Sequence, residues 1–509
     1  MGIKIDITPN HLKTLQALLN QYLPNTLVWA FGSRVKFTAK PNSDLDLVAF
    51  ISKAQELKFS LLKDALEESN IPFRIDLHNW NELPETFHKN IENGFVEIQS
   101  NKKLELPSEW KTYKLGDLIN VKHGFAFKGE YFSDEPTTDI LLSPGNFKIG
   151  GGFKSDKFKY YKGDFPTDYI LKEGDIIITM TDLSKAGDTL GYSANIPPHI
   201  GINYLHNQRL GLVQFKNDEI DPKFLYWILR TQPYQYYIVG SATGSTVKHT
   251  SPTRICTYEF EAPEDKATQT QIAQILTSLD DKIELNLQIN QTLEAMAQAI
   301  FKEWFVDFKF PSFDGELVDG LPKGWRMGKV GEEFKLTMGQ SPKGETLNQE
   351  NEGMIFYQGR TDFGFRFPTN RVFTTEPNRI ANKLDTLVCV RAPVGDVNIA
   401  IEKCCIGRGL SAVMHKSNAY SYTYYAMKNI EPIFKGFESE GTVFGSLNKN
   451  NFENIEVVVP TKELIKEFEK VVNPMDEKIL NNSIQIQTLT TTRDTLLPKL
   501  MSGKIEIKN

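Results

Sequence analysis

Two acidic residues near the N-terminus, Asp44 and Asp46, have the type and spacing of a metal and phosphate site. They bracket one leucine in SDLDL and follow the Gly32–Ser33 pair. Residues two apart on a strand point to the same face, so the two carboxylates would lie side by side. Two adjacent like charges are costly unless a cation lies between them, and hard cations such as Mg²⁺ prefer oxygen ligands. The stretch therefore predicts a metal and phosphate site.

Length, composition and charge limit what kind of protein carries this site. A chain of 509 residues should form several domains, and we expect three globular units. No apolar run is long enough to cross a membrane and MGIKIDITPN lacks the apolar core of a secretory signal, so we expect a cytoplasmic protein with no membrane partner. The four cysteines form no CxxC pair, which makes a zinc ribbon or a disulfide framework unexpected.

The net charge of −6 does not exclude a nucleic-acid partner. Residues 264–305 alone contribute −4, so the surplus acid is concentrated in one segment and the other segments are close to neutral. Local basic patches can still dominate the surface of a domain that is neutral as a whole.

An internal repeat organises most of the chain. LPSEWKTYKLGDLINVKHG, which begins at Leu106, matches LPKGWRMGKVGEEFKLTMG, which begins at Leu321, 215 residues later. The GSTV turn at 244–247 answers GTVF at 441–444. The unit is one globular domain followed by one long helix, used twice. We therefore expect domains at 1–100, 106–263 and 318–460 and long helices in 264–308 and 461–509.

The two long segments show the three-and-four spacing of a coiled-coil seam. Ile272, Leu276, Ile283 and Leu293 belong to the first stripe, which also contains Asn286, and Asn482 is its match in the second segment. Each helix either packs on its own domain or pairs with the other helix, and we favour pairing, with the asparagines fixing the register. A helix of about 38 residues would be roughly 57 Å long.

Within each repeat, short apolar runs such as DIIIT and LGLVQF, separated by glycine-rich loops, predict strands in an α+β (mixed α/β) domain. Aromatic and basic residues interleave in NFKIGGGFKSDKFKYYKGDF and in RTDFGFRFPTNRVF. Lysine and arginine contact phosphates, and arginine also reads guanine edges. The alternative is that these are ordinary solvated strands whose aromatic residues belong to the core. The recurrence of the pattern in the second copy makes this alternative weaker. The basic residues that we expect to contact DNA are Lys148, Lys154, Lys157, Lys159, Arg209, Lys248 and Arg254 in the first copy and Arg360, Arg366, Arg371, Arg408 and Lys449 in the second.

On these features, residues 106–505 resemble the specificity subunit of a type I restriction-modification system. The resemblance implies two target recognition domains that read a bipartite site in double-stranded DNA, held apart by an antiparallel helix pair. It also implies two adenine methyltransferase subunits and the restriction and translocation subunits as partners, with catalysis in those partners. In agreement, we find no [DN]PP[FYW] tetrapeptide and no GxxxxGK[ST] phosphate loop. The ExK within GEEFK at 331–335 is expected by chance.

The first 100 residues resemble a minimal nucleotidyltransferase domain of the DNA polymerase beta type. The residues that carry the resemblance are Gly32, Ser33, Asp44, Asp46 and Asp76. The resemblance implies that the three acids bind two Mg²⁺ ions, which orient a nucleoside triphosphate, ATP being expected. It also implies that Gly32 lets the backbone approach the phosphates, that Ser33 binds one and that Arg34 or Lys36 screens their charge. TPNHLKTLQALLNQYLP, before the site, predicts a helix opened by Thr8 or Asn10.

Two functions fit these features. The first is a DNA-reading specificity subunit that carries a nucleotidyltransferase-like appendage, active or inactive. The second is an AMP-transferring enzyme that uses the repeated domains as substrate-recognition arms. A degenerate subunit that has kept its fold and lost its partners is a third, plainer possibility. The first two predict metal binding at the N-terminal acids and diverge on what removal of residues 1–100 would do.

Overall fold

The structure is a computed structural model, and it describes residues 5–24, 26–40, 43–51, 55–100, 109–182, 184, 187–244, 247–439 and 445–507. The chain divides into two compact units, Met1–Ser278 with Thr492–Asn509 and Leu279–Thr491. The GTVF turn at 441–444, Ser245 and Thr246 of GSTV, and residues 106–108 of the LPSEW start lie outside the described residues. No helix among the described residues is long and apolar enough to cross a membrane.

The N-terminal domain is a four-stranded sheet in the order β3-β2-β1-β4. Strands β2 and β3 are parallel, and β1 is antiparallel to β2 and β4. Its strands and helices are α1 (Pro9–Tyr22), β1 (Val28–Phe31), β2 (Leu45–Ala49), α2 (Glu56–Glu67), β3 (Ile75–Asn79), α3 (Glu85–Glu92) and β4 (Val96–Gln99). Thr8 caps α1 by accepting a hydrogen bond from His11 N at 3.2 Å, which confirms the predicted helix start.

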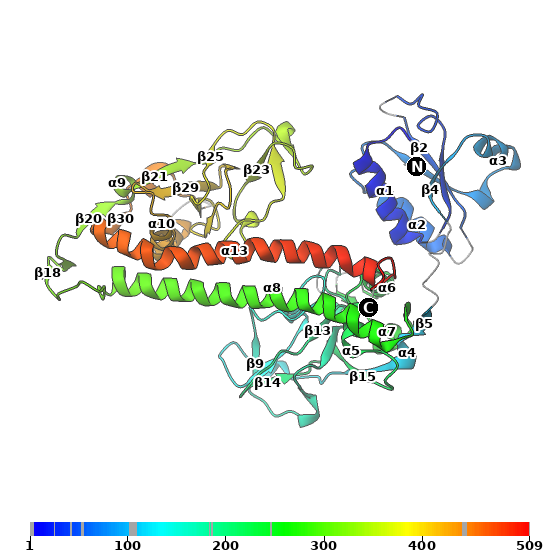
Figure 1. Ribbon diagram of the computed structural model, residues 1–509, viewed down its shortest axis with the longest axis horizontal. Helices are drawn as coiled ribbons and strands as arrows, with labels where there is room; N and C mark the ends of the chain where they lie inside the picture. The colour runs from blue at the N-terminus through cyan, green and yellow to red at the C-terminus, as the bar shows by residue number, and fades with distance from the viewer. Residues whose placement is uncertain are drawn as a thin grey trace. The chain divides into compact units, whose positions relative to one another are not determined.

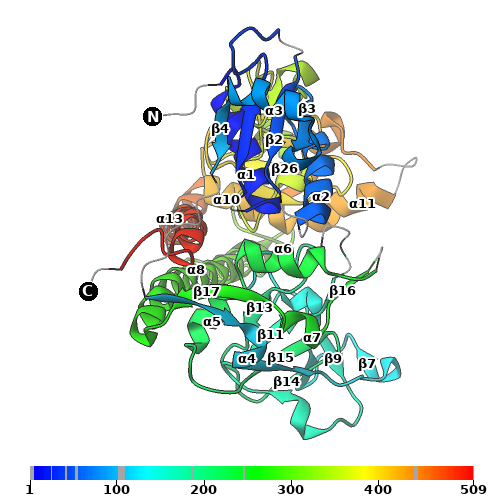
Figure 2. The ribbon, with the colours of Figure 1, turned by 90° about the vertical axis from the view of Figure 1, so that its right-hand side faces the viewer.

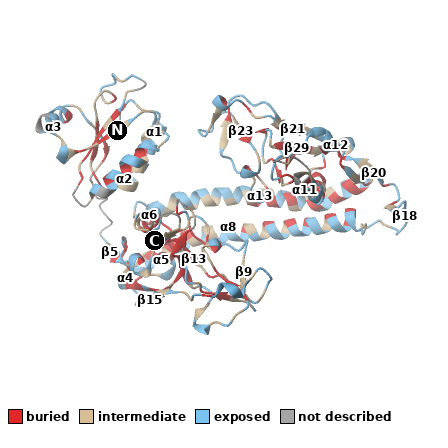
Figure 3. Cartoon of the chain, turned by 180° about the vertical axis from the view of Figure 1, so that it is seen from behind, coloured by how far each residue is buried: buried red, intermediate tan, exposed pale blue. Residues whose placement is uncertain are grey.

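Alternation along the strands gives this sheet one face that packs in the core and a second face on which acidic and aromatic residues are mixed. Val28, Ala30, Leu45 and Leu47 are buried in a core that helices α1 and α2 complete (Figure 2). Buried residues accordingly concentrate along these strands in Figure 3. The residues between them point to the opposite face, where Asp46 lies among aromatic and apolar neighbours.

The first repeat domain, residues 109–263, belongs to the first unit. Its strands are β5 (Trp110–Lys114), β6 (Ile119–His123), β7 (Phe132–Ser133), β8 (Asp139–Leu141), β9 (Lys159–Tyr161), β10 (Ile170–Leu171), β11 (Ile176–Thr179), β12 (Thr181–Asp182), β13 (Ser193–Asn195), β14 (Asn203–Leu205), β15 (Leu210–Phe215), β16 (Lys248–His249) and β17 (Glu259–Pro263). Its helices are α4 (Leu115–Leu118), η3 (Gly129–Tyr131), η4 (Pro144–Asn146), η5 (Thr167–Tyr169), α5 (Pro222–Ile228), α6 (Gln232–Gly240) and α7 (Pro252–Ile255), the η segments being 3₁₀ turns.

The second repeat domain, residues 317–460, belongs to the second unit. Its strands are β18 (Leu317–Val318), β19 (Leu321–Pro322), β20 (Arg326–Lys329), β21 (Phe334–Met338), β22 (Leu347–Asn348), β23 (Met354–Tyr357), β24 (Val372–Thr374), β25 (Ile380–Ala381), β26 (Thr386–Cys389), β27 (Val397–Ile399), β28 (Cys404–Ile406), β29 (Leu410–His415) and β30 (Glu456–Val459). Its helices are α9 (Val330–Glu333), η7 (Gly344–Thr346), η8 (Arg360–Asp362), α10 (Tyr420–Asn429), α11 (Glu431–Ser439) and α12 (Lys449–Glu453).

The two repeat domains share one topology, which confirms the predicted mixed α/β fold. The five-stranded sheet β10-β14-β8-β9-β7 of the first has its equivalent in β25-β28-β23-β24-β22 of the second. The four-stranded sheet β13-β11-β15-β6 likewise has its equivalent in β27-β26-β29-β21. The apolar runs DIIIT, LGLVQF, TLVCV and SAVMH fall on β11, β15, β26 and β29, as predicted.

A two-stranded antiparallel ribbon opens and closes each repeat domain. In the first domain Trp110 pairs with Pro263, so β5 lies beside β17. In the second domain Arg326 pairs with Val459, so β20 lies beside β30. The chain therefore enters and leaves each domain at neighbouring strands.

A long helix follows each ribbon. Helix α8 (Lys266–Phe301) continues into a π-helical turn, η6 (Lys302–Val306), and α13 (Lys462–Leu500) follows the second ribbon. The two helices run antiparallel and side by side (Figure 1), and within the second unit Asn286 donates to Gln485 Oε1 at 2.7 Å while Asn482 donates to Asn290 Oδ1 at 2.9 Å. All three asparagines are buried, which confirms the predicted pairing with asparagines in the seam.

Each unit packs its repeat domain against parts of both helices. In the first unit Leu276 of α8 and Leu500 of α13 share a core with Trp227 of the first repeat domain. In the second unit Ala297 and Phe468 share a core with residues of the second repeat domain. Neither helix therefore has a fully solvated apolar stripe, and both sequence alternatives, packing on a domain and pairing with the other helix, are realised together.

Candidate functional site

Two of the N-terminal acids lie on the mixed acidic and aromatic face of the first sheet. Phe31 pairs with Asp46 across β1 and β2, and Asp46 pairs with Asp76 across β2 and β3. Because paired residues on neighbouring strands point to the same face, the two carboxylates are neighbours there. Asp44 is exposed and lies directly before β2 instead of within it. The structure therefore brings Asp46 and Asp76 together and leaves Asp44 at the edge.

Gly32 allows the loop after β1 to approach these acids. Its φ angle is +81°, and a Cβ atom there would lie 2.3 Å from Asp46 Oδ2. No residue with a side chain could occupy this position without moving the carboxylate. The loop then turns tightly, with Lys36 N donating to Gly32 O at 3.2 Å and Thr38 N donating to Ser33 O at 3.0 Å. This geometry suits close approach of backbone to a bound phosphate.

The electrostatics of Asp46 fit a cation site. Burial, the neighbouring Asp76 and, to a smaller extent, Asp44 raise the pKa of the Asp46 carboxyl above its ordinary value, although His78 opposes the shift. Like charges that penalise ionisation of a carboxylate would be relieved by a divalent cation. Asp76 is held at 2.9 Å by Arg74. In the described ranges no group of three or more His, Cys, Asp or Glu side chains is placed to hold a metal ion, so Asp46 and Asp76 are the two neighbouring carboxylates that one could use.

Arg34 departs from its predicted role in binding the nucleotide. Its guanidinium is buried, donates from Nε at 3.0 Å and from a terminal nitrogen at 2.7 Å to Ser43 O, and donates to Asp6 O at 2.9 Å. It also lies 3.7 Å from the centre of the Phe73 ring. Arg34 therefore fixes the loop between β1 and β2 from the interior. Ser33 is half-buried and Lys36 is exposed, and both stay predictions.

The predicted DNA contacts of the first repeat domain spread over several loops and strands. Exposed side chains are those of Lys154, Lys157, Lys159, Arg209 and Arg254, whereas Lys148 and Lys248 are half-buried. Lys154 forms an ion pair with Asp156 at 3.1 Å. Surface pairs of this kind are weak, so the lysine can exchange its partner for a phosphate.

In the second repeat domain four of the five predicted arginines and lysines are exposed. Arg360 pairs with Asp396, Arg371 with Asp362 and Lys449 with Glu453. Arg408 lies in the turn before β29, the position that Arg209 has before β15 in the first domain.

Arg366 was predicted to contact DNA, and this prediction is wrong. Its side chain is fully buried and pairs with Glu294 of α8 and, at 2.6 Å, with Asp476 of α13. Its guanidinium also donates to the Tyr425 hydroxyl at 2.8 Å. Burial opposes its charge, but the adjacent Asp476 carboxylate and its neighbours raise the arginine pKa above its usual range. Arg366 therefore ties the second repeat domain to both helices.

The sequence did not predict the other residues of this buried cluster. Glu294 and Asp476 are nearly fully buried, and Tyr424 donates its hydroxyl hydrogen to Glu294 Oε1 at 3.0 Å. The first domain contains a comparable unpredicted residue, Arg230, whose guanidinium lies 4.3 Å from the Trp227 ring. The sequence carried no signal for this burial, because Arg366 lies in the same basic and aromatic stretch as the exposed Arg360 and Arg371.

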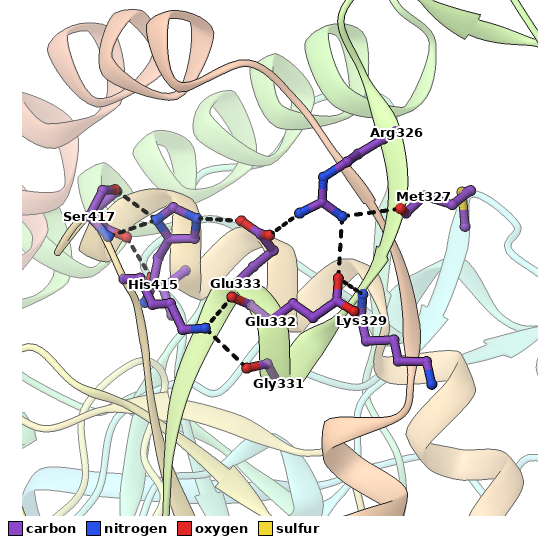
Figure 4. Close-up of polar contacts among 11 residues, drawn as sticks. Arg326, Met327, Lys329, Gly331, Glu332, Glu333, His415 and Ser417 are labelled. Atoms are coloured by element: carbon purple, nitrogen blue, oxygen red, sulfur yellow. Dashed lines mark hydrogen bonds and ion pairs between the residues drawn. The ribbon is translucent and has the colours of Figure 1, made fainter.

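The GEEFK segment forms a local polar network (Figure 4). Arg326 pairs with Glu332 at 3.2 Å and with Glu333 at 2.5 Å, and Lys416 donates to Gly331 O at 3.2 Å. The first domain repeats the last contact, because Lys216 donates to Gly116 O. Glu333 forms an ion pair with Arg326, and the contact between a lysine and a glycine carbonyl recurs in the first domain. We therefore interpret this network as one that stabilises the α9 turn.

Comparison with known proteins agrees with this architecture. The chain matches the family described as "Type I restriction modification DNA specificity domain" twice, over residues 107–295 and 322–490, and "Polymerase beta, Nucleotidyltransferase" over residues 13–104. The chain therefore belongs to the type I restriction-modification specificity subunits, and its N-terminal domain is a polymerase-beta-type nucleotidyltransferase domain. Both predicted resemblances are confirmed.

Individual relatives cover the two parts separately. The "Putative type I restriction enzyme MjaX specificity subunit" of Methanocaldococcus jannaschii is 28% identical over 79% of this chain and 95% of its own length. The "Type I restriction enzyme HindI specificity subunit" of Haemophilus influenzae is 27% identical over 78% of this chain and 100% of its own length. The "Probable protein adenylyltransferase MntA" of the same organism is 43% identical over 20% of this chain and 89% of its own length.

A solved structure supports the fold. The type I restriction-modification S subunit from M. genitalium superposes with a TM-score of 0.54, covering 80% of this chain and 98% of its own, at 20% sequence identity. Both the repeat domains and the helix pair thus have a counterpart of known structure.

Proposed function

We propose that this chain reads a bipartite site in double-stranded DNA for a type I restriction-modification complex. Each repeat domain reads one half-site through its exposed basic residues. The observation that carries the proposal is the duplication of one topology, each copy closed by its own ribbon and followed by its own long helix. Two similar readers in one chain suit a target that consists of two separate short sequences.

The same proposal gives the helix pair a scaffolding role. Two adenine methyltransferase subunits bind along α8 and α13, and restriction and translocation subunits join that core. The chain supplies specificity and its partners supply catalysis. The buried asparagine contacts of the seam support this proposal, because a helix pair with fixed register offers partners a defined surface.

The N-terminal domain is proposed to bind ATP with Mg²⁺ and to transfer AMP to a hydroxyl group of a partner protein, where the oxygen bonds to the α-phosphorus, the α–β phosphoanhydride bond breaks, and pyrophosphate and the hydroxyl proton leave. Asp46 and Asp76 would hold the metal ions with Asp44, and Gly32 and Ser33 would face the phosphates. The ions would supply charge neutralisation at the phosphates and a lower pKa at the attacking hydroxyl. The residues present favour this proposal through the acidic face of the sheet and the close approach of Gly32 to Asp46.

The experiment that tests the DNA-reading proposal is co-expression of the full chain with the methyltransferase subunit of its own host, followed by methylome sequencing. We expect methylated adenines in two short sequences separated by a spacer of constant length. A methylome that is the same with and without this chain would refute the proposal. Exchange of the second repeat domain for that of a relative should change one half of the motif only.

A further inference from the structure

Two short hairpins have the same position in the two repeat domains. The first, residues 147–153, follows η4 and closes with a bridge between Phe147 and Phe153. The second, residues 363–368, follows η8 and closes with a bridge between Phe363 and Pro368. Their backbone bonds are also similar, since the residue after the first phenylalanine donates its N–H back across the loop in both, at 2.9 and 3.1 Å. The shape is kept although the loop sequences differ.

The tip of each hairpin is an exposed apolar side chain. Ile149 is the third residue after η4 and is 77% exposed, and Phe365 is the third residue after η8 and is 53% exposed. A single exposed apolar residue is ordinary on a protein surface. Its recurrence at one position in two divergent loops indicates a shared role.

Each hairpin is anchored against an aromatic pair beneath it. The pair consists of the fifth and sixth residues of α5, Tyr226 and Trp227, and of the fifth and sixth residues of α10, Tyr424 and Tyr425. An arginine lies over each pair, and its guanidinium carbon is 4.3 Å from the Trp227 ring in the first domain and 4.2 Å from the Tyr424 ring in the second. Cations over aromatic faces are stabilised by the ring electrons.

The two anchoring arginines come from different parts of the chain. Arg230 follows α5 and donates from Nε to Gly150 O at 3.0 Å, so it reaches up into the hairpin. Arg366 belongs to the hairpin itself and reaches down between α8 and α13. In the first hairpin Gly151 has a φ angle of +86°, and a Cβ atom there would lie 2.6 Å from Arg230 Cγ. Arginines from different parts of the chain thus hold the two hairpins next to their tips, and both tip side chains stay exposed.

The charges beside the tips fit a nucleic acid better than a protein surface. Lys148, Lys154 and Lys157 flank Ile149 along the chain, and Arg360 and Arg371 flank Phe365. Basic side chains hold phosphates on either side of a groove. A rigid apolar tip between them can contact a thymine methyl group or wedge into a base step.

We propose that Ile149 and Phe365 are equivalent DNA-contacting tips, one for each half-site, and that Arg230 and Arg366 are the positioning residues that hold them. This inference rests on the proposed DNA-reading function and makes it more specific. It assigns to each half-site one apolar contact, to a thymine methyl group or a base step, in addition to the basic contacts. Substitution of one tip should therefore affect its own half-site alone.

The test uses the full chain in complex with its methyltransferase subunit and a DNA duplex that contains the methylated motif. Phe365→Ala and Ile149→Ala should each weaken binding to that duplex by roughly tenfold, whereas affinity for the methyltransferase subunit stays unchanged. Each substitution should relax sequence preference in one half-site only, and in different halves. Ile200→Ala is the matched control, because Ile200 is a 98% exposed apolar loop residue outside both hairpins, and it should leave DNA affinity unchanged.

Contrary outcomes separate this inference from the function on which it rests. A wild-type complex without any bipartite preference would overturn both. If the wild-type complex reads its motif but Phe365→Ala and Ile149→Ala bind DNA as tightly as Ile200→Ala does, only the proposed DNA contact of the two tips would be refuted. Loss of methyltransferase binding in Phe365→Ala or Ile149→Ala would instead place the tips in a protein interface. All three side chains are exposed, so circular dichroism should show the same folded content in every variant.

Discussion

The carboxyl group of Asp46 is costly to ionise in the folded N-terminal domain. Its pKa is raised by burial and by neighbouring carboxylates, so its ionised form is penalised in the folded protein. This penalty exists above the folded pKa and disappears as the pH falls toward the ordinary value. A protein without need of a cation would gain stability by losing this charge.

Asp46→Asn is therefore expected to raise the thermal unfolding midpoint of the N-terminal domain at neutral pH in the absence of divalent cations. The difference from wild type should shrink as the pH falls toward the ordinary aspartate pKa, because the raised pKa makes the folded protein take up this proton before the unfolded chain does. Calorimetry of the full chain measures both. Adding Mg²⁺ should raise the midpoint of wild type and leave that of the variant unchanged. Glu97→Gln is the control, because Glu97 is an exposed carboxylate on β4. This substitution should leave the unfolding midpoint, its pH dependence and its response to Mg²⁺ as they are in wild type.

Arg366 allows a second prediction at this scale. Arg366→Met would leave the buried carboxylates of Glu294 and Asp476 without their cation and should cost about 3–5 kcal/mol of unfolding free energy. Urea denaturation of the full chain measures the loss. Arg360→Met, which removes a half-exposed pair, should cost no more than about 1 kcal/mol. Combining Arg366→Met with Glu294→Gln and Asp476→Asn should restore most of the loss, and an unrestored triple variant would contradict the role of the buried charges.

Residue type alone could not separate these roles in advance. Arg360, Arg366 and Arg371 lie within one basic and aromatic stretch, and only the packing of α10 against the helix pair decides that the middle one is buried. The burial of Arg34 could not be predicted for a similar reason, since its guanidinium donates to the backbone oxygens of Ser43, nine residues later, and of Asp6, 28 residues earlier. Strand alternation predicted Asp44 and Asp46 side by side, but Asp44 lies before β2, and the proximity of Asp46 to Asp76 agrees instead with what the nucleotidyltransferase resemblance implied.

At the scale of elements the sequence was more informative. The seam spacing predicted α8 and α13, and the repeated start and the apolar runs predicted equivalent strands. Such patterns are local and periodic, so they survive without knowledge of long-range contacts. The pairing of Asn482 with Asn290 in place of its repeat partner Asn286 could not be predicted, because antiparallel register depends on both domains that the helices carry.

The asparagine seam predicts a specific pattern of stability. Asn290→Leu alone removes the acceptor of the buried Asn482 amide and should destabilise the second unit by about 1–3 kcal/mol. Asn290→Leu with Asn482→Leu should recover that loss or exceed wild type, because polar seam residues sacrifice stability for register. Denaturant unfolding compares the variants. Gln288→Leu, on the exposed side of α8, should be neutral, and a double variant no better than the single one would refute the pairing.

At the scale of the molecule, the appendage and the DNA readers should be separable functions. Deletion of residues 1–100 is expected to leave the methylated motif intact when the methyltransferase subunit is co-expressed, because the N-terminal domain has its own core. Methylome sequencing measures this outcome. Asp44→Asn with Asp46→Asn should abolish AMP transfer and leave the same motif. Loss of every methylated site in a folded deletion variant would favour the enzyme whose repeated domains serve only as substrate arms.

The ribbons that close the repeat domains have a consequence for recombination of the gene that encodes the chain. Since β5 lies beside β17 and β20 beside β30, the chain enters and leaves each repeat domain at two adjacent strands. A genetic crossover within the codons of a long helix consequently transfers a whole repeat domain together with the ribbon that closes it. A population that carries a few alleles of each repeat domain can then form every pairwise combination of the two domains. New bipartite DNA specificities arise in this way by recombination instead of by gradual mutation.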